Sequence, residues 1–243
     1  MVRDGTGTVT GESIERRGTM PVVTGCVGIV LAGGHGQRLF PGGNPQGKAG
    51  VESAGRSFLA CVREALAAVA ERVIVVTGPG MTVPADAGPL TVVHDTRPAA
   101  GPLAALADGL EWVVAGPGAE TVVVAAVDLP LITPAVPRWL LRRLAEPGAT
   151  GACPDWVVPV VDGHRQVLLS ALRPTLLPHV RAYLATGRRD PRGLVERLLA
   201  TDPAVVRLVA GDEVPAGDGQ FFDIDRPEDL RRLDGLRSRQ GGI

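Results

Sequence analysis

The chain has few aromatic residues and few cysteines. Aromatic residues make up only 3% of its 243 residues, so we expect a core built from valine, leucine and alanine. The three cysteines are scattered along the chain, and no two of them form a Cys-x-x-Cys pair. An odd number of dispersed cysteines argues against a disulfide framework or a structural zinc site, and it is typical of a protein from the reducing cytoplasm.

The chain also lacks a strong net charge and a long apolar run. Its 25 Lys and Arg residues balance 26 Asp and Glu residues, which argues against a general binder of nucleic acid or of membrane surfaces. No segment reaches the roughly 18 consecutive apolar residues of a membrane-spanning helix. We therefore expect a soluble, cytoplasmic protein with a disordered leader over residues 1–21 and a flexible tail over residues 237–243. A basic cluster at Arg188, Arg189 and Arg192 suits a small anionic ligand.

Buried strands and amphipathic helices alternate between residues 22 and 150. Apolar, β-branched runs predict strands at 26–32, 72–77, 90–94 and 121–127. Apolar residues at helical spacing, together with capping signals, predict helices at 58–70, 101–114 and 133–145. Strands that alternate with helices predict a mostly parallel, Rossmann-like α/β sheet covered by helices on both faces.

The pattern changes after residue 150. Two strands, at 156–161 and 166–171, flank the turn Asp162-Gly163 and predict a small antiparallel insertion. Helices at 173–185 and 192–200 and a strand at 204–209 follow, and Asp225 with Glu228 forms a capping box for a last helix. Because no linker-like segment interrupts the pattern, we expect a single domain over residues 22–236.

A glycine-rich turn follows the first strand. Gly33, Gly34 and Gly36 would let the backbone approach a phosphate closely and present N–H groups to it. Arg38 can grip phosphate oxygens, and Lys48 can reach back to them as a point charge. An ordinary strand-to-helix turn is the alternative reading, but the full set of residues favours phosphate binding.

Two better-known phosphate loops fit this region less well. Residues 42–49 nearly match the P-loop pattern, but Ala49 lacks the hydroxyl group that would contact magnesium. Residues 34–39 nearly match the dinucleotide fingerprint, but Leu39 occupies the position of its third glycine. Both motifs are therefore minor alternatives.

Acidic residues follow other predicted strands. Asp128 comes directly after the strand at 121–127, where a carboxylate is well placed to bind Mg²⁺ on a triphosphate. Asp95 follows the strand at 90–94 and would either line the same sheet edge or cap a turn. Asp225 would be a metal ligand, a helix cap or both. Ligands of open α/β sheets bind at the carboxyl ends of the strands, so we expect these side chains to lie near the glycine-rich turn.

Together these motifs resemble a known family. The segments that carry the resemblance occur in order over residues 25–236, and they are Leu31-Ala32-Gly33-Gly34-x-Gly36-x-Arg38-Leu39, Lys48, Gly55-Arg56, Gly101-Pro102-Leu103, Asp128-x-Pro130 and Asp225-x-Pro227-Glu228-Asp229-Leu230. This arrangement resembles the molybdenum cofactor guanylyltransferases and the wider nucleotidyltransferase superfamily, which has a nucleotide-diphospho-sugar transferase-like fold.

The resemblance implies a reaction and roles for individual residues. It implies Mg²⁺-dependent transfer of GMP from GTP to the phosphate of molybdenum-loaded molybdopterin, with release of pyrophosphate. The implied catalytic residues are Arg38 and Lys48, and the implied metal ligands are Asp128 and Asp225. The implied nucleotide-binding residues are Leu31, Ala32, Gly33, Gly34, Gly36, Lys48 and Asp95.

The sequence departs from the family pattern at two places. The stretch 39–48 is longer than the compact turn of family members, carries two prolines and lacks an acidic residue before Lys48. Asp223 and Asp225 stand where members usually have asparagine. These differences leave two alternatives open, namely a cytidylyl or sugar-phosphate nucleotidyltransferase and a non-catalytic, nucleotide-binding regulatory relative.

Overall fold

The computed structural model describes residues 22–240, apart from residues 35, 43, 98–99, 149–150 and 215–218. The leader expected at residues 1–21 lies outside this described part, and so do the last three residues of the expected tail.

An eight-stranded sheet forms the centre of the molecule, in the order β10-β7-β9-β6-β1-β4-β5, with β8 paired to β7. Its strands are β1 (Val23–Leu31), β4 (Ala70–Thr77), β5 (Thr91–His94), β6 (Thr121–Ala126), β7 (Trp156–Val161), β8 (His164–Arg165), β9 (Leu169–Leu172) and β10 (Val206–Ala210). The strand β1 pairs in parallel with β4 and β6, β4 with β5, and β7 with β10. The prediction of a mostly parallel sheet is confirmed.

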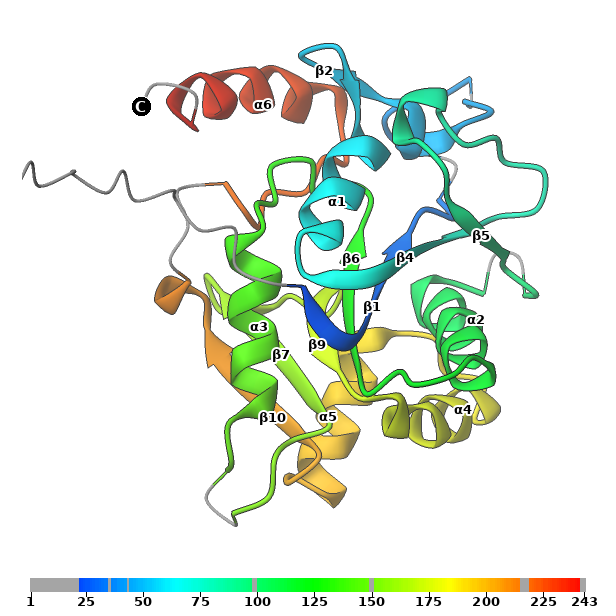
Figure 1. The fold of residues 1–243 in the computed structure, drawn as a ribbon. Coiled ribbons are helices and arrows are strands. Elements are labelled where there is room, and N and C mark those ends of the chain that lie inside the picture. The colour runs from blue at the N-terminus through cyan, green and yellow to red at the C-terminus, as the bar shows by residue number, and fades with distance from the viewer. Residues whose placement is uncertain are drawn as a thin grey trace, which may run out of the picture.

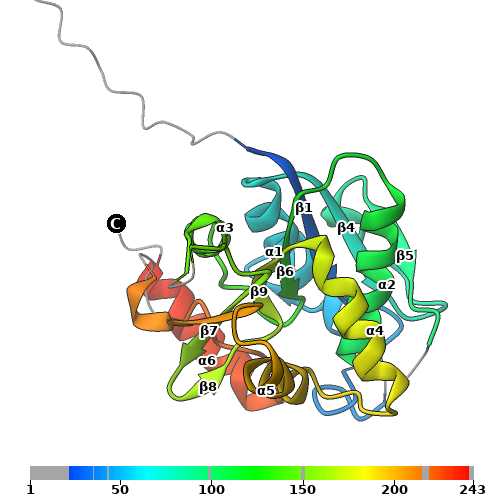
Figure 2. The ribbon, with the colours of Figure 1, turned by 90° about the horizontal axis from the view of Figure 1, so that it is seen from below.

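Helices cover both faces of this sheet (Figure 1 and Figure 2). They are α1 (Phe58–Ala67), α2 (Pro102–Ala115), α3 (Ala135–Ala145), α4 (Leu177–Ala185), α5 (Pro191–Thr201) and α6 (Pro227–Gln240), with 3₁₀ turns η1 (Gly47–Gly50), η2 (Ala85–Ala87), η3 (Pro174–Leu176) and η4 (Gly211–Glu213). Buried side chains of α1, α3 and α6 join one hydrophobic cluster, and those of α2, α4 and α5 join another. Neighbouring residues of β1 alternate between the two clusters, as expected for a strand buried on both faces.

The antiparallel part of the sheet differs from the sequence prediction. The strand expected at 166–171 begins only at Leu169, as β9, and a separate short strand, β8, precedes the expected range. Asp162 and Gly163 have φ angles of 49° and 75°, and they form a tight turn that returns β8 along β7. The chain then continues into β9, which lies between β6 and β7 and runs antiparallel to both. The predicted antiparallel segment is therefore present, and it forms part of the main sheet.

A short hairpin was not predicted at all. Its strands are β2 (Glu52–Ser53) and β3 (Arg56–Ser57), which form a separate two-stranded sheet. Each strand has only two residues, so no alternation of apolar and polar residues could reveal it.

The predicted capping box of the last helix is wrong by one residue. Pro227 begins α6, so the position three residues into the helix falls on Asp229 and not on Glu228. The Asp229 Oδ2 atom accepts hydrogen bonds from the backbone N–H groups of Asp225 and Arg226, at 3.1 and 2.9 Å. The Asp225 carboxylate is therefore not used for capping and can contact other groups.

The helix α6 also extends past the expected domain boundary at residue 236. It continues to Gln240 because its last turns are anchored to the hairpin and to α1. Arg237 Nη1 donates to the Ser53 carbonyl at 2.8 Å, and Arg237 Nη2 donates to Cys61 Sγ at 3.2 Å. The start of the tail expected at residue 237 is thus helical.

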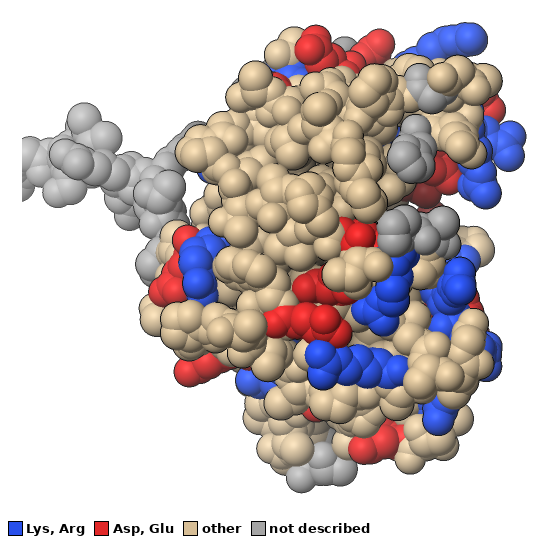
Figure 3. Space-filling view, turned by 90° about the vertical axis from the view of Figure 1, so that its right-hand side faces the viewer, with Lys and Arg blue, Asp and Glu red and all other residues tan. Residues whose placement is uncertain are grey.

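The surface is mixed in charge. On the face shown in Figure 3, acidic and basic side chains of the described residues lie next to one another across the middle. Charges of opposite sign at short spacing cancel at a distance, so this face does not produce the extended positive field that nucleic acid binding needs. None of the helices in the described part of the chain has both the length and the apolar character that crossing a bilayer requires.

Candidate active site

A cavity of about 440 Å³ lies at the carboxyl ends of the central parallel strands. The residues that line it from the sheet edge are Leu31, Gly33, Gly34, Gly78, Pro79, Asp95, Val127 and Asp128. Lys48 also lines it, as does the first turn of α2 with Gly101 and Pro102. A helix N-terminus attracts anions through its unpaired N–H groups. The structure therefore brings six of the predicted site residues to one cavity, namely Leu31, Gly33, Gly34, Lys48, Asp95 and Asp128.

Two predicted residues support this cavity without lining it. Ala32 is buried, and its N–H donates to the Val76 carbonyl at 2.8 Å, so its backbone belongs to the sheet. Gly36 has a φ angle of 62°, and its carbonyl accepts hydrogen bonds from the N–H groups of Leu39 and Phe40. Gly36 thus shapes the turn that follows the strand.

Gly47 is a site residue that the sequence analysis passed over. Its φ angle is 54°, and a Cβ atom at this position would collide with the Gly34 carbonyl oxygen and the Met81 side chain. This close approach folds the unusual stretch 39–48 back onto the glycine-rich turn. It places Lys48 at the cavity, although the stretch is longer than in the family pattern.

The Lys48 ammonium lies between two carboxylates. Its Nζ atom is 2.8 Å from Asp128 Oδ2 and also contacts Asp225 Oδ1. Arg38 Nη1 lies 3.6 Å from Asp225 Oδ2, but the Arg38 side chain is 79% exposed, so this ion pair is weak and the guanidinium can turn to a ligand. The Ile224 N–H donates to the Asp128 carbonyl at 3.0 Å, which holds the Asp225 segment beside the end of β6.

Burial and charge act in opposite directions on this cluster. Burial alone would lower the pKa of Lys48, but Asp128 and Asp225 outweigh it and the pKa is raised. Burial raises the pKa of the Asp128 carboxyl, the Lys48 charge offsets part of this rise, and the negative charges of Asp225 and Asp223 add to it. The three carboxylates of Asp128, Asp225 and Asp223 thus surround the single ammonium group of Lys48. Their excess negative charge would favour an additional cation there.

The Asp128 and Asp225 carboxylates suit Mg²⁺, which prefers oxygen ligands. Within the described ranges, no three or more His, Cys, Asp or Glu side chains are grouped so that they could hold a metal by themselves. Mg²⁺ in nucleotide sites usually takes one or two carboxylates and completes its shell with water and phosphate oxygens. The donor set therefore fits a Mg²⁺ ion that arrives with a triphosphate.

A second cavity, of about 340 Å³, adjoins the first. Asp128 lines both of them, together with Pro102, Ala126 and Leu168. The second cavity also carries two basic side chains, Arg165 and Arg192, and the acidic residues Asp190, Asp223 and Asp225. Two cavities that meet at one carboxylate can hold two substrates whose reacting groups lie side by side.

Asp95 faces the first cavity from the end of β5. Its Oδ1 atom accepts a hydrogen bond from the Arg97 N–H at 2.8 Å. Burial raises the pKa of the Asp95 carboxyl, and the neighbouring Asp108 carboxyl raises it further. Asp108 is itself buried and accepts hydrogen bonds from the N–H and hydroxyl groups of Thr96, at 2.9 and 2.7 Å. Asp95 therefore holds a proton more tightly in the native state than in the unfolded chain.

Other lining residues were not identified from the sequence. Gly78 and Pro79 directly follow β4, so the strand-end rule that selected Asp95 and Asp128 could also have found them. Arg165 in β8 and Leu168 just before β9 reach the cavities because the chain pairs with β7 as β8 and then enters the main sheet between β6 and β7 as β9. No local sequence signal predicts that position.

We expect Gly47→Ala to lower the affinity for a nucleoside triphosphate at least tenfold. An alanine at this φ angle is strained, and its Cβ would push the Lys48 turn away from Gly34. Isothermal titration calorimetry measures the effect. Gly42→Ala is the control, because a Cβ at Gly42 in the same loop meets no atom within 4 Å. Equal affinities for the two variants would contradict the role of Gly47.

We expect Asp95→Asn to raise the free energy of unfolding at pH 7. The native pKa of Asp95 is above the ordinary value of 3.8. The protonated carboxyl therefore stabilises the native state fully at pH values below 3.8, and this contribution is lost as the pH rises through the native pKa. The advantage of the variant should shrink as the pH falls toward 3.8. Urea denaturation at several pH values measures it.

Asp86→Asn is a control of opposite sign for this measurement. Asp86 Oδ2 accepts a hydrogen bond from the Ser57 N–H at 2.8 Å, and this bond lowers the pKa of Asp86. Its ionised form therefore stabilises the native state at pH 7, and this contribution is lost as the pH falls through the native pKa. Shifts of the same sign in both variants would show that the account of Asp95 is wrong.

Solved structures share the architecture of this chain. Molybdopterin-guanine dinucleotide biosynthesis protein A from Archaeoglobus fulgidus is 21% identical, with a TM-score of 0.64 over 88% of this chain and 99% of that one. A protein of Mycobacterium tuberculosis H37Rv, crystallised in complex with manganese, is 20% identical, with a TM-score of 0.53 over 88% of this chain and 98% of that one. These structures confirm the nucleotide-diphospho-sugar transferase-like fold.

Sequence comparisons identify the family. The model of the MobA-like NTP transferase domain matches residues 28–203. A molybdenum cofactor guanylyltransferase from Bradyrhizobium sp. (strain ORS 278) is 36% identical over 230 residues, which cover 91% of this chain and 98% of the relative. The chain therefore belongs to the MobA-like NTP transferase family and is a nucleotidyltransferase of the molybdenum cofactor guanylyltransferase type.

Proposed function

We propose that this chain transfers GMP from GTP to the phosphate of molybdenum-loaded molybdopterin and releases pyrophosphate. The observation that carries the proposal is the meeting of two cavities at Asp128, beside the Lys48 ammonium. The Bradyrhizobium relative is a molybdenum cofactor guanylyltransferase, which supports GTP as the donor and the molybdenum cofactor as the acceptor.

The first cavity is the proposed GTP site. A Cβ atom at Gly34 would meet no atom within 4 Å, so a phosphate group can approach the backbone there. Gly101 and Pro102 place the N-terminus of α2 at the same cavity, where its dipole favours the triphosphate. The Asp95 carboxylate would accept hydrogen bonds from the ring N–H and amino groups of guanine, which are both donors.

The reaction needs charge stabilisation more than acid–base catalysis. A phosphate oxygen of the acceptor attacks the α-phosphorus of GTP, the bond from that phosphorus to the bridging oxygen breaks, and pyrophosphate leaves. The second pKa of a phosphate monoester is about 6, so the acceptor is already a nucleophile at neutral pH. Lys48 and Arg38 would stabilise the negative charge that spreads over the phosphates.

We propose that Asp128 and Asp225 hold a Mg²⁺ ion, which would neutralise charge on the triphosphate. The manganese complex of a structural relative supports a divalent cation in this fold. Two of the three N–H donors of the Lys48 ammonium face Asp128 and Asp225. With the Asp225 carboxylate bound to Mg²⁺, Lys48 would exchange Asp225 for a phosphate oxygen when GTP enters the cavity.

Arg38→Ala and Asp128→Ala should each lower the rate of pyrophosphate release at least tenfold. A tenfold loss corresponds to about 1.4 kcal/mol of transition-state stabilisation. The assay contains Mg²⁺, GTP and molybdenum-loaded molybdopterin. Arg142→Ala is the matched control, because Arg142 is an exposed residue of α3 that lines neither cavity. Wild-type rates in both the Arg38 and the Asp128 variants would contradict the site.

The same assay tests the choice of substrates. CTP and the other nucleoside triphosphates replace GTP in turn, and sugar phosphates replace molybdopterin. Faster release with CTP or with a sugar phosphate would overturn the proposed substrates. Tight GTP binding without pyrophosphate release from any pair would show a nucleotide-binding protein that has lost turnover.

A further inference from the structure

The helix α2 carries a buried carboxylate near its middle. Asp108 is only 4% exposed, and the other buried residues of α2 are Leu, Ala, Val and Gly. Burial of a carboxylate is costly unless nearby donors satisfy it, and an apolar side chain at the same place would carry no such cost. The proposed reaction makes no use of Asp108, so the groups that it binds indicate its role.

Asp108 accepts hydrogen bonds from two consecutive residues in the connection between β5 and α2. The Thr96 N–H donates to Asp108 Oδ2 at 2.9 Å, and the Thr96 hydroxyl donates to Oδ1 at 2.7 Å. Arg97 Nη2 also donates to Oδ1, at 3.2 Å. Hydrogen bonds to an ionised acceptor are stronger than those between neutral groups. We call Asp108, Thr96 and Arg97 the Asp108 clamp, because they tie this connection to the body of α2.

The Asp108 clamp holds Asp95 at the first cavity. Asp95 lines that cavity and directly precedes Thr96. On its other side, the Asp95 N–H continues the sheet by donating to the Thr77 carbonyl at 2.8 Å. Asp95 Oδ1 accepts a hydrogen bond from the N–H of Arg97 at 2.8 Å. The Asp95 carboxylate is therefore fixed by the sheet on one side and by the clamp on the other.

The contribution of Asp108 to this carboxylate is one of position and not of charge. Burial is the main cause that raises the pKa of Asp95, the N–H and the charge of Arg97 lower it, and Asp108 raises it. The negative charge of Asp108 thus disfavours the ionised form of Asp95. Only ionised Asp95 can accept hydrogen bonds with both of its oxygens. A benefit of Asp108 to ligand binding must therefore come from the hydrogen bonds of the clamp.

We propose that Asp108 is a positioning residue for the choice of the nucleotide base. Through Thr96 and Arg97 it holds the Asp95 carboxylate where that group meets two adjacent donors, the ring N–H and the amino group of guanine. A base that lacks one of these donors gains less from the fixed carboxylate. This inference rests on the proposed function, and it adds a residue outside the cavity on which base selection depends.

Calorimetric titration of GTP and of ITP with Mg²⁺ tests the proposal, because ITP lacks only the amino group of guanine. We expect wild type to bind GTP about tenfold more tightly than ITP. Asp108→Ala should weaken GTP binding about tenfold and bring the two affinities within about twofold, since binding must then also order the loop. Thr96→Val, which removes one donor of the clamp, should lower the ratio of the two affinities to a smaller extent.

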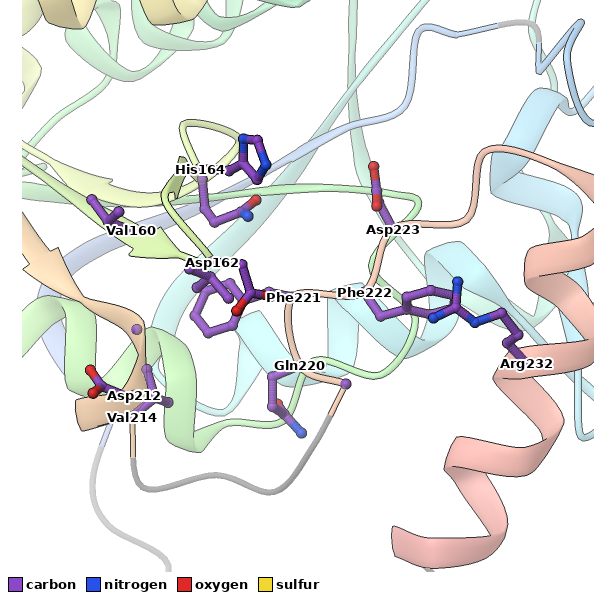
Figure 4. Close-up of a pocket in the computed structure, with 14 residues that line it drawn as sticks. Val160, Asp162, His164, Asp212, Val214, Gln220, Phe221, Phe222, Asp223 and Arg232 are labelled. Carbon is purple, nitrogen blue, oxygen red and sulfur yellow. The ribbon is translucent and has the colours of Figure 1, made fainter.

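Two control variants separate this effect from losses of stability and of charge. Val113→Ala weakens the packing of the same helix, because Val113 is a buried residue of α2 that does not line the first cavity. Asp212→Ala removes a carboxylate at a third cavity, of about 860 Å³, and among the described residues that cavity shares no lining residue with the first (Figure 4). Both variants should keep the wild-type ratio of affinities. An equal fall of the ratio in Val113→Ala would overturn the proposal.

A double-mutant cycle tests whether Asp108 acts through Asp95. Asp95→Ala removes the carboxylate that the clamp holds, so adding Asp108→Ala should weaken GTP binding no further. Additive losses would contradict the proposal. In the pyrophosphate assay, Asp108→Ala should raise the KM for GTP about tenfold and leave kcat within about twofold, because the clamp acts on the base and not on the phosphates.

The titrations separate failure of the clamp from failure of the proposed function, since they contain no acceptor and need no turnover. A preference for GTP that Asp108→Ala removes supports the clamp even if no pyrophosphate is ever released. An unchanged ratio in Asp108→Ala, or a wild-type protein that binds GTP and ITP equally, would overturn the clamp whatever the enzyme assay shows.

Discussion

The contact of the Lys48 ammonium with Asp128 and Asp225 is the interaction on which the rest of the site depends. It joins segments that are 80 and 177 residues apart in the chain. Without the lysine, two carboxylates would lie close together, and each would disfavour the ionised form of the other. With it, the Asp225 segment stays beside the end of β6 and the ammonium stays at the first cavity. One ion cluster therefore assembles the candidate site from three parts of the sequence.

The sheet explains why this cluster lies between two cavities. The parallel strands β1, β4 and β6 end at one edge, and they supply the glycine-rich turn, Gly78 and Asp128. The antiparallel strand β9 lies next to β6, and the segment that leads into it, with Arg165 and Leu168, lines the cavity on the other side of Asp128. The parallel half of the sheet thus forms the proposed donor site, and the antiparallel half forms the proposed acceptor site.

The sequence predicted the donor half of the site better than the acceptor half, for a physical reason. Buried strands that end in glycine or aspartate are local signals, and they led directly to Gly33, Gly34, Asp95 and Asp128. The position of β9 depends on pairing between strands that are distant in the chain, and no local pattern records it.

Two further details also depend on three-dimensional contacts. The close approach of Gly47 to Gly34 explains how a lengthened turn still places Lys48 at the cavity. The offset between Pro227 and Asp229 explains why Asp225 is not the helix cap. A motif read only from residue spacing could not settle either point.

The most direct test of the central claim is a crystal structure of the chain with Mg²⁺ and a GTP analogue that carries a methylene group between its α- and β-phosphorus atoms. The account predicts the triphosphate at Gly33 and Gly34, the cation at Asp128 and Asp225, and the Lys48 ammonium moved from Asp225 to a phosphate oxygen. A nucleotide bound elsewhere, or a Lys48 side chain still paired with both carboxylates, would contradict it.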